Sequence, residues 1–261
     1  GKAENTIILY LGDHGAQFSR GKCSNYEAAL RVPLIIKWPG HATPGIRKSD
    51  LVSVIDLLPT LLDVSGIDIP ELLPRKSLIP LLLNKKDATG HDYIFADGSG
   101  SAAFFYFPKR SVRDSRYKLI YNLLQDRENP KFMQYAEQMG AHFAGGTKLS
   151  EIESASLEVQ RAYQTWRTPP TYELYDLQED PLEFNNLSSN PQYGDIMGSL
   201  INELNKWQTD TGDPLADPEK LARYTREVDS VANSYSRNSY ARDPEFQWKY
   251  PGYFYENDTP E

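Results

Sequence analysis

The chain has 261 residues, 39% of them hydrophobic and 25% charged, a composition typical of an ordinary globular protein. Its net charge of −8, without a block of basic residues, disfavours nucleic acid or an anionic membrane as the main partner. No apolar run approaches the roughly 18 residues that a membrane span requires. The single cysteine, Cys23, excludes an internal disulfide and a cysteine-based metal cluster.

The first five residues are polar and contain no apolar core of a signal peptide. The sequence does not begin with Met, and it enters an apolar run almost at once. These two features predict that the sequence is a fragment of a longer protein.

The stretch Thr6–Gly40 contains the first candidate for chemistry. Thr6–Leu11 is a short, nearly continuous apolar run, which predicts a strand covered on both faces, as in a parallel sheet. Asp13 and His14 follow this strand directly, where ligands gather in open α/β sheets. A carboxylate and an imidazole there could share one divalent cation. The alternative is that Asp13 caps a helix and His14 is an ordinary loop residue.

Up to residue 103 the pattern predicts further strands and one helix. Val32–Trp38 is a second apolar strand, and Tyr93–Ala96 is a short strand before a Gly- and Ser-rich run. From Ser53 the spacing becomes helical, with Asp56 as the expected N-cap and Gly66 as the stop.

Residues 104–229 predict a second, antiparallel unit. Phe104–Leu124 has the pattern of a hairpin that turns at Asp114-Ser115, and Tyr172–Asp176 is a further strand. Helices are predicted at four places, the second with Ser150 and Glu153 as a capping box, and the third with an apolar stripe typical of a core-facing helix: Lys131–Met139, Ser150–Trp166, from Pro191 past Trp207, and Pro218–Val228. From residue 230 the chain is polar and rich in Tyr and Asn, which predicts a surface-wrapping tail over 230–261.

Several blocks in this order resemble the C-terminal half of a sulfatase, in the alkaline-phosphatase-like superfamily. They are Leu11–Gly15, Gly21-Lys22 with Tyr26-Glu27, Arg31–Ile35, Trp38–Gly40, Ile55–Leu62, Tyr172–Asp176, Asp180-Pro181 and Asn185–Leu187. Each block is weak alone, but the ordered set is specific.

The second half is most similar to the heparan N-sulfatases (N-sulfoglucosamine sulfohydrolases). The matching pieces are Lys109–Arg113, Arg116–Leu123, and Leu204–Trp207 with Asp213-Pro214. The lysosomal members of that group carry Asn where this chain has His14, and Arg where it has Lys22. His14 is still a residue type that binds metals, and Lys22 is still a cation, but the two changes leave the exact substrate open.

The resemblance implies a fold and a domain organisation. The expected class is α/β, with residues 1–103 as the C-terminal part of an alkaline-phosphatase-like sandwich built on a mainly parallel sheet. Residues 104–229 would form a smaller α+β subdomain with an antiparallel sheet and a packed helix. Residues 230–261 would be the tail.

The resemblance also implies a site. Sulfatases use a divalent metal, usually calcium, and Asp13 and His14 would be the second pair of its ligands. On ligand type alone zinc or manganese would be as reasonable, because calcium prefers oxygen. Lys22 matches the family residue that touches the substrate sulfate, and an ammonium suits a sulfate oxygen. The alternative is a solvated surface lysine.

The nucleophile of the family is absent from this sequence. Sulfatases oxidise a Cys or Ser within a Cys/Ser-x-Pro-Ser/Ala-Arg motif to formylglycine, and no such motif occurs here. We therefore expect this chain alone to be inactive, and its partners to be the N-terminal half of the same polypeptide and a sulfated glycan. The family resemblance further implies export, to the periplasm, the cell exterior or the lysosome.

Two other functions remain open from the sequence. One is a phosphodiesterase or phosphonate hydrolase of the same superfamily, in which Asp-His pairs bind transition metals. The other is a non-catalytic relative that only binds sulfated glycans. Arg20, Arg110 and Arg113 could bind anionic sugar groups or form structural ion pairs. The histidines at 41, 91 and 142 are expected to be structural. A sheet edge left without neighbours predicts poor solubility of the isolated chain.

Overall fold

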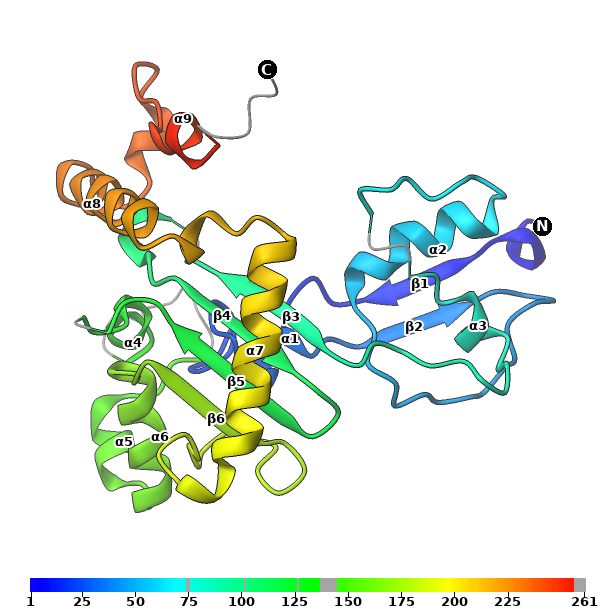
Figure 1. The fold of residues 1–261 in the computed structure, drawn as a ribbon, viewed down its shortest axis with the longest axis horizontal. Coiled ribbons are helices and arrows are strands. Elements are labelled where there is room, and N and C mark those ends of the chain that lie inside the picture. Colours follow the sequence, from blue (N-terminus) through cyan, green and yellow to red (C-terminus); the bar gives the residue numbers. More distant parts are fainter. Residues whose placement is uncertain (74–75, 101, 126, 137–144, 256–261) are drawn as a thin grey trace.

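A computed structural model of the chain describes residues 1–73, 76–100, 102–125, 127–136 and 145–255. The elements form two lobes that lie side by side (Figure 1). The smaller lobe contains β1 (Ile8–Leu11), β2 (Leu34–Lys37), α2 (Leu57–Val64) and α3 (Ile79–Leu82). The larger lobe contains α1 (Glu27–Leu30), β3 (Ile94–Gly98), β4 (Lys109–Arg113), β5 (Tyr117–Asn122), α4 (Pro130–Ala136), α5 (Leu149–Ser154), α6 (Leu157–Arg167), β6 (Tyr172–Asp176), α7 (Gly194–Asp210), α8 (Pro218–Ser234) and α9 (Tyr250–Phe254).

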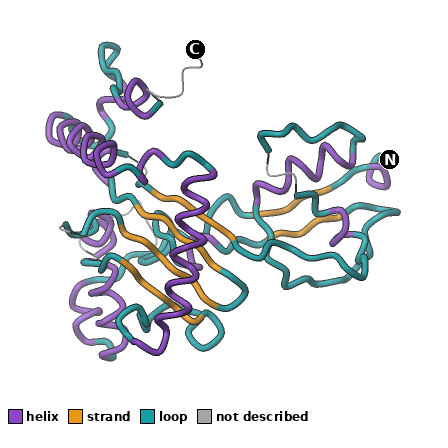
Figure 2. Tube along the Cα trace, viewed as in Figure 1, coloured by secondary structure: helices purple, strands orange, loops and turns teal. Residues whose placement is uncertain are grey.

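The strands of the smaller lobe do not form the expected parallel arrangement. β1 pairs with β2 antiparallel, with Ile8 opposite Lys37 and Leu11 opposite Leu34. A parallel pair needs a crossover that returns the chain to its starting edge. Residues 12–33 instead run to the larger lobe and back, with only the single turn of α1, so the chain re-enters β2 in the opposite direction. Figure 2 shows these two strands apart from the second group.

Asp56 is the N-cap residue of α2, as predicted, but its side chain makes no capping hydrogen bond to this helix. Ser53 caps the 3-10 turn Val54–Asp56 that precedes α2: its hydroxyl accepts from the backbone N–H of Ile55, and the Asp56 carboxylate accepts from the N–H of Ser53 at 2.7 Å. Gly66 has the left-handed φ of +68° that ends a helix, as predicted. The apolar stripe of this segment lies on the exposed side, with Ile55 56% and Leu58 52% exposed.

The larger lobe is built on a four-stranded antiparallel sheet in the order β3-β4-β5-β6. The predicted hairpin is β4 and β5, with Arg113 opposite Lys118 across the turn. Successive residues on one strand point to opposite faces. Leu119 therefore packs towards α7 with Leu200 and Leu204, while Ile120 packs towards α4, α5 and α6. Both faces of this sheet are covered, which places the main core here (Figure 1).

The predicted helices of the larger lobe are present with shifted ends. The segment expected as one helix from Ser150 is two, because the chain leaves the helical conformation at Ala155 and Ser156, and Ser156 caps α6. The capping box also involves other residues than predicted. The Glu151 carboxylate, not that of Glu153, accepts from the N–H of Lys148. The helix expected up to Met139 is described only to Ala136. The helix predicted from Pro191 is α7, preceded by one 3-10 turn.

The last part of the chain contains more structure than its composition predicts. The helix expected at Pro218–Val228 continues to Ser234, and α9 follows a 3-10 turn at Ser239–Arg242. Aromatic side chains from this part pack against α8 and the segment Ala103–Phe105. The division at residues 103/104 and 229/230 stays a prediction.

Among the described residues, no helix is both long enough and apolar enough to span a membrane.

Candidate functional site

Asp13 and His14 lie just past β1, in the turn that leaves the smaller lobe. The side chain of Asp13 is 88% exposed and that of His14 is 37% exposed. The Nδ1 atom of His14 lies 2.7 Å from the carbonyl oxygen of Gly15. Since a carbonyl only accepts, Nδ1 carries the proton, and Nε2 keeps its lone pair for another partner.

The two candidate ligands point the same way. Nε2 of His14 lies 3.5 Å from Oδ2 of Asp13. Two ligand atoms at roughly 2.4 Å from one calcium, at right angles, lie roughly 3.4 Å apart, and zinc at tetrahedral angles gives a similar spacing. The pair therefore fits one divalent cation, and the spacing does not distinguish calcium from zinc.

The pair is not a complete metal site. Over the described ranges, no group of three or more His, Cys, Asp and Glu side chains is arranged to bind a metal ion. A two-donor set leaves at least four positions of a calcium ion open, since calcium takes about six to eight ligands. Any cation at Asp13 and His14 would need ligands from another source.

The loop after His14 folds back on itself and brings Lys22 close to the turn. The backbone N–H of Lys22 donates to the carbonyl of Ala16 at 3.0 Å, and the N–H of Gly21 donates to Phe18 at 2.9 Å. Arg20 and Cys23 have left-handed φ values of 60° and 69°. A Cβ added at Gly21 would lie 2.2 Å from the carbonyl oxygen of Ala16, so glycine is required there.

The start of this loop is equally tight. The N–H of Gly15 donates to the carbonyl of Ala29 at 2.8 Å, and a Cβ at Gly15 would meet the carbonyl oxygen of Ala28 at 1.8 Å. The turn that carries Asp13 and His14 therefore lies directly against α1. The Asp-His-Gly pattern and the Gly-Lys pattern both depend on the missing side chain of their glycine.

Buried ion pairs fasten this loop to the larger lobe. The Glu27 carboxylate lies 3.0 Å from the Nζ of Lys118 and 2.5 Å from a guanidinium nitrogen of Arg113. Burial opposes its ionisation, but these two cations lower the pKa of Glu27 below its usual value. Lys118, 1% exposed, also lies 3.2 Å from Glu183, whose pKa is raised by burial.

A second set of contacts joins the loop to β6 and to the segment after it. The hydroxyl of Tyr26 donates to Glu173 at 2.7 Å. The guanidinium of Arg20 donates to the carbonyls of Leu182 and Glu183, and it stacks over the ring of Tyr26 at 4.3 Å. The loop with Lys22 thus rests on a rigid scaffold, the arrangement expected for a functional loop.

Two buried lysines lie beside Lys22 and Cys23. The pKa of Lys131 is lowered, mainly by burial. The charge of Lys22 also lowers this pKa, whereas the side chain of Cys23 opposes the shift. Burial also lowers the pKa of Lys109 to about 8, against the opposing effects of Glu173 and Cys23. The side chains of Lys109 and Lys131 therefore both lie within electrostatic reach of Cys23.

The sequence did not single out Lys109 and Lys131. An isolated lysine in a strand or helix pattern has no signal, because lysines are usually solvated. β4 is itself mostly polar, with the sequence Lys-Arg-Ser-Val-Arg, so Lys109 does not stand out in it.

The three arginines considered from sequence have protein partners. Arg110 makes a two-pronged contact with Asp213, at 2.7 Å for each hydrogen bond. Arg113 pairs with Glu27, and Arg20 binds backbone carbonyls. The structural interpretation is the better one, because each guanidinium already binds protein groups, although the buried Nε of Arg20 has no hydrogen-bond partner among the described residues.

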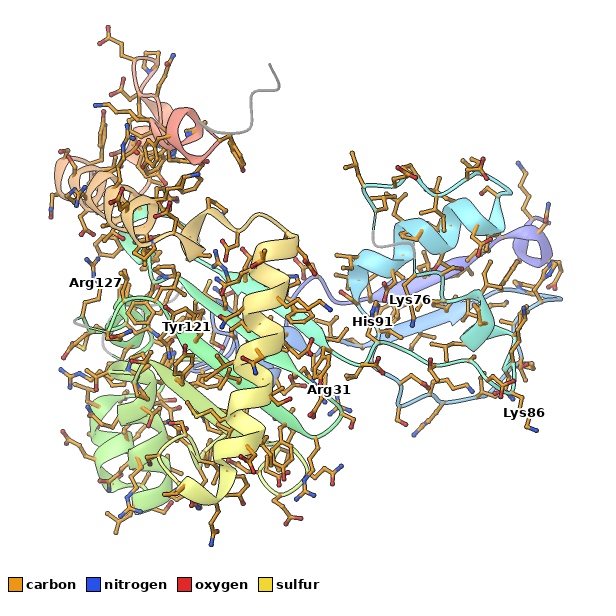
Figure 3. The ribbon with its side chains drawn as sticks, in the orientation of Figure 1. Arg31, Lys76, Lys86, His91, Tyr121 and Arg127 are labelled. Atoms are coloured by element: carbon orange, nitrogen blue, oxygen red, sulfur yellow. The ribbon has the colours of Figure 1, made fainter. Side chains whose placement is uncertain are left out.

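Two of the remaining histidines are structural in the described residues. Nε2 of His91 lies 2.9 Å from both carboxylate oxygens of Asp56, which is fully buried. Figure 3 labels His91 in the smaller lobe, near α2. The ring of His41 stacks on Trp38 at 4.4 Å. His142 lies outside the described residues.

Comparison with known proteins relates this chain to sulfatases. The family described as "N-sulphoglucosamine sulphohydrolase, C-terminal" matches residues 12–138. An ulvan-active sulfatase of Formosa agariphila is 31% identical over 216 residues, which cover 82% of this chain and 39% of that protein. The human N-sulphoglucosamine sulphohydrolase is 27% identical over 226 residues, covering 82% of this chain and 43% of that protein.

Among solved structures, a 2-O GAG sulfatase is similar with a TM-score of 0.58 and 22% identity. That similarity covers 95% of this chain and 42% of the other. The chain thus spans about two fifths of the length of the curated relatives it matches.

The chain has a mixed α/β fold, like that of the matched sulfatase structure. The matched family model and relatives identify it as a sulfatase C-terminal region. The expected fold class is confirmed at this level, although the strands that the structure describes pair antiparallel.

Proposed function

We propose that this chain forms one side of the active site of a sulfatase that removes sulfate from a sulfated glycan. The observation that carries the proposal is the loop from Asp13 to Lys22. It carries Asp13, His14 and Lys22 on one turn-and-loop unit that buried ion pairs fasten to the larger lobe, and the 3.5 Å between Nε2 of His14 and Oδ2 of Asp13 supports our assignment of these two as metal ligands. The matched relatives are sulfatases, which supports the same reaction class.

The chemistry assigns each residue a role. A sulfate group leaves when negative charge on its oxygens and on the leaving atom is stabilised. A divalent metal, when bound, supplies Lewis-acid stabilisation of that charge and orients the nucleophile. Asp13 and Nε2 of His14 would bind the metal, and the Nζ of Lys22 would donate to a sulfate oxygen. The formylglycine nucleophile would come from the N-terminal half of the polypeptide.

We propose calcium as the metal, with zinc or manganese as the alternatives. Asp13 supplies the oxygen ligand that calcium prefers, and the exposed turn leaves room for further oxygen ligands. His14 is the less suitable ligand for calcium and would fit zinc or manganese. Metal analysis of the active protein, with reactivation of the metal-free protein by each ion in turn, decides among them.

We further propose that the N-terminal half covers the smaller lobe. One face of the β1–β2 ribbon presents Tyr10 and Ile35, 63% and 62% exposed, which lie opposite each other across the two strands. Ile55, in the 3-10 turn before α2, and Leu58, in α2, are also more than half exposed. Apolar surface of this extent favours association and predicts poor solubility when it is left uncovered.

The test is reconstitution. The chain is joined to, or mixed with, an N-terminal half of a sulfatase that carries a converted nucleophile motif. Sulfate release from sulfated oligosaccharides should then appear and should depend on a divalent metal, whereas the chain alone should release none. Reading the gene upstream of Gly1 for an in-frame nucleophile motif and an export signal tests the expected partner and the expected export.

The role of Lys22 is tested with matched variants of the joined protein. Lys22→Ala should lower kcat by about 10²–10³, the loss typical of one charge-stabilising donor. Lys22→Arg should retain part of the activity, because it keeps the cation. Lys86→Ala, at an exposed position in the smaller lobe (Figure 3), is the control and should leave kcat unchanged. Undiminished turnover in Lys22→Ala would remove the role given to it.

The same assay separates the two other functions. Paired aryl sulfate and aryl phosphonate substrates distinguish a sulfatase from a phosphonate hydrolase. A joined protein that binds sulfated glycan but turns over neither substrate would indicate the non-catalytic relative.

A further inference from the structure

A second cavity lies outside the loop of Lys22. It has a volume of about 160 Å³ and lies between the segment after β3, the helix α8 and the last part of the chain. Ligand sites for drug-sized molecules have volumes of about 300–1,000 Å³. This cavity therefore has room for a single ring rather than for two linked rings.

Half of the residues that line it are aromatic, and their rings pack against one another. The ring of Tyr224 packs edge-on against Tyr106 at 5.2 Å and Tyr250 at 5.1 Å. Trp248 lies 5.8 Å from Tyr250 and 5.5 Å from Tyr240. Such mutual packing fixes the orientation of each ring, so the cavity presents ring faces and edges in fixed positions.

The polar tips of this wall are available. Within the part of the chain that the structure describes, the hydroxyls of Tyr224 and Tyr250 and the indole N–H of Trp248 have no hydrogen-bond partner. All three side chains are only half-buried. Ser99 and Gly100 form the opposite rim. An occupant would thus meet apolar ring faces in the middle and donors and acceptors at the edge.

Charge is absent from the wall itself. None of the described residues that line the cavity is an Asp, Glu, Lys or Arg. A sulfate or carboxylate would find no cation there, and an ammonium ion would find no anion. The wall therefore favours a neutral ring with apolar faces and hydroxyl edges, which is the character of an unsulfated pyranose.

The cavity is close to the Lys22 loop. A Cβ at Gly100 would lie 2.0 Å from the carbonyl oxygen of Phe105, so this rim packs on the backbone before Tyr106. The Nζ of Lys131 lies 3.5 Å over the ring of Phe105, and the charge of Lys22 acts on Lys131. The rim at Ser99 also directly follows β3, whose last residue lies beside Asn25 and Lys109.

We propose that this aromatic cavity is a sugar-binding subsite that takes one unsulfated ring of the glycan chain whose sulfate is bound at Lys22. The inference rests on the proposed function for the identity of the chain, but the binding of a neutral ring can be measured independently. Trp248 and Tyr250 belong to the last part of the sequence, after the motif blocks that resemble sulfatases. The subsite would therefore differ between this protein and relatives with other C-terminal segments.

The experiment uses the whole 261-residue chain and isothermal titration calorimetry. The probes are neutral oligosaccharides of N-acetylglucosamine and of rhamnose, compared with sulfated oligosaccharides, at low and at high salt. An unsulfated probe should bind with an affinity that salt does not change, because no charge lines the cavity. Its affinity should also be unaffected by Lys22→Ala.

Two variants test the location. Tyr250→Ala should weaken the unsulfated probe about tenfold, the loss expected for one aromatic contact. Ala102→Phe fills the cavity without removing a ring and should abolish binding. Tyr255→Ala, an exposed aromatic residue in the same segment that does not line the cavity, is the matched control and should bind like the parent. Thermal melts confirm that each variant is folded.

Several outcomes would overturn the proposal: no binding of any unsulfated probe, binding that Ala102→Phe leaves intact, or preferential binding of choline, which would make the cavity a cation cage. Failure of sulfate release in the joined protein would count against the proposed function alone. Salt-independent, Lys22-independent binding of a neutral oligosaccharide would stand in either case.

Discussion

The two lobes of this chain bury their apolar residues to different degrees. In the larger lobe, Val112, Leu119 and Leu174 are fully buried under α7. In the smaller lobe, Tyr10 and Ile35 are more than half exposed on one face of the β1–β2 ribbon. The larger lobe therefore supplies its own core, while the smaller lobe has apolar surface that another surface would stabilise. The candidate site lies in the connection between them.

The connecting residues 12–33 are stabilised mainly by contacts with the larger lobe. Lys118→Ala leaves Glu27 and Glu183 buried without their shared cation, and breaking such a pair costs about 3–5 kcal/mol. Denaturant unfolding measures this loss of unfolding free energy. In the same variant, protease should cleave residues 12–33 earlier than in the parent. The control is Arg167→Ala, because that cation pairs with Glu128 at an exposed position and should cost about 0–1 kcal/mol. Equal losses in the two variants would contradict the assignment.

The difference in burial itself can be tested with one pair of variants. Leu119→Ala removes a fully buried side chain and should cost about 2–5 kcal/mol of unfolding free energy. Ile35→Ala, at 62% exposure, should change it by less than about 0.5 kcal/mol in the isolated chain. In the complex with an N-terminal half, Ile35→Asp should weaken association. A large loss for Ile35→Ala in the isolated chain would show that this face is already covered.

The smaller lobe has one strong internal constraint of its own. Asp56 accepts from the N–H of Ser53 and lies 2.9 Å from His91, which fastens the start of α2 to the segment before β3. Asp56→Asn weakens both contacts and should cost about 1–3 kcal/mol. Hydrogen exchange should show faster exchange confined to α2 and its neighbours. Exchange that increases equally in the larger lobe would mean that the two lobes unfold as one unit.

A buried amine gives the larger lobe a distinct dependence on pH. Because the pKa of Lys109 is lowered to about 8, the folded chain has lost this proton between about pH 8 and 10.5 while the unfolded chain retains it. Unfolding then takes up a proton, so the unfolding free energy should rise with pH by up to about 1.4 kcal/mol per unit in that window. Lys109→Met should remove the rise; a rise that persists in this variant would assign it to another group. Tyr106, whose pKa is raised to about 12, acts in the opposite direction above about pH 10.

The sequence alone determined the local elements. The apolar spacing of α7, the turn at Asp114-Ser115 between β4 and β5, and Gly66 at the end of a helix each describe one face or one turn, which neighbouring residues define by themselves. The ordered motifs around Asp13, His14 and Lys22 likewise indicated the family, because each motif records a local backbone requirement such as the close approach at Gly21.

Only the tertiary structure decided which elements meet. It pairs β1 with β2 antiparallel, exposes the stripe of α2, and couples Glu27 to Lys118 across 91 positions. It also brings Tyr106 and Trp248 to one cavity. The reason is physical: periodicity reports which side of an element is apolar, whereas the partner of that side depends on contacts between residues far apart in the chain.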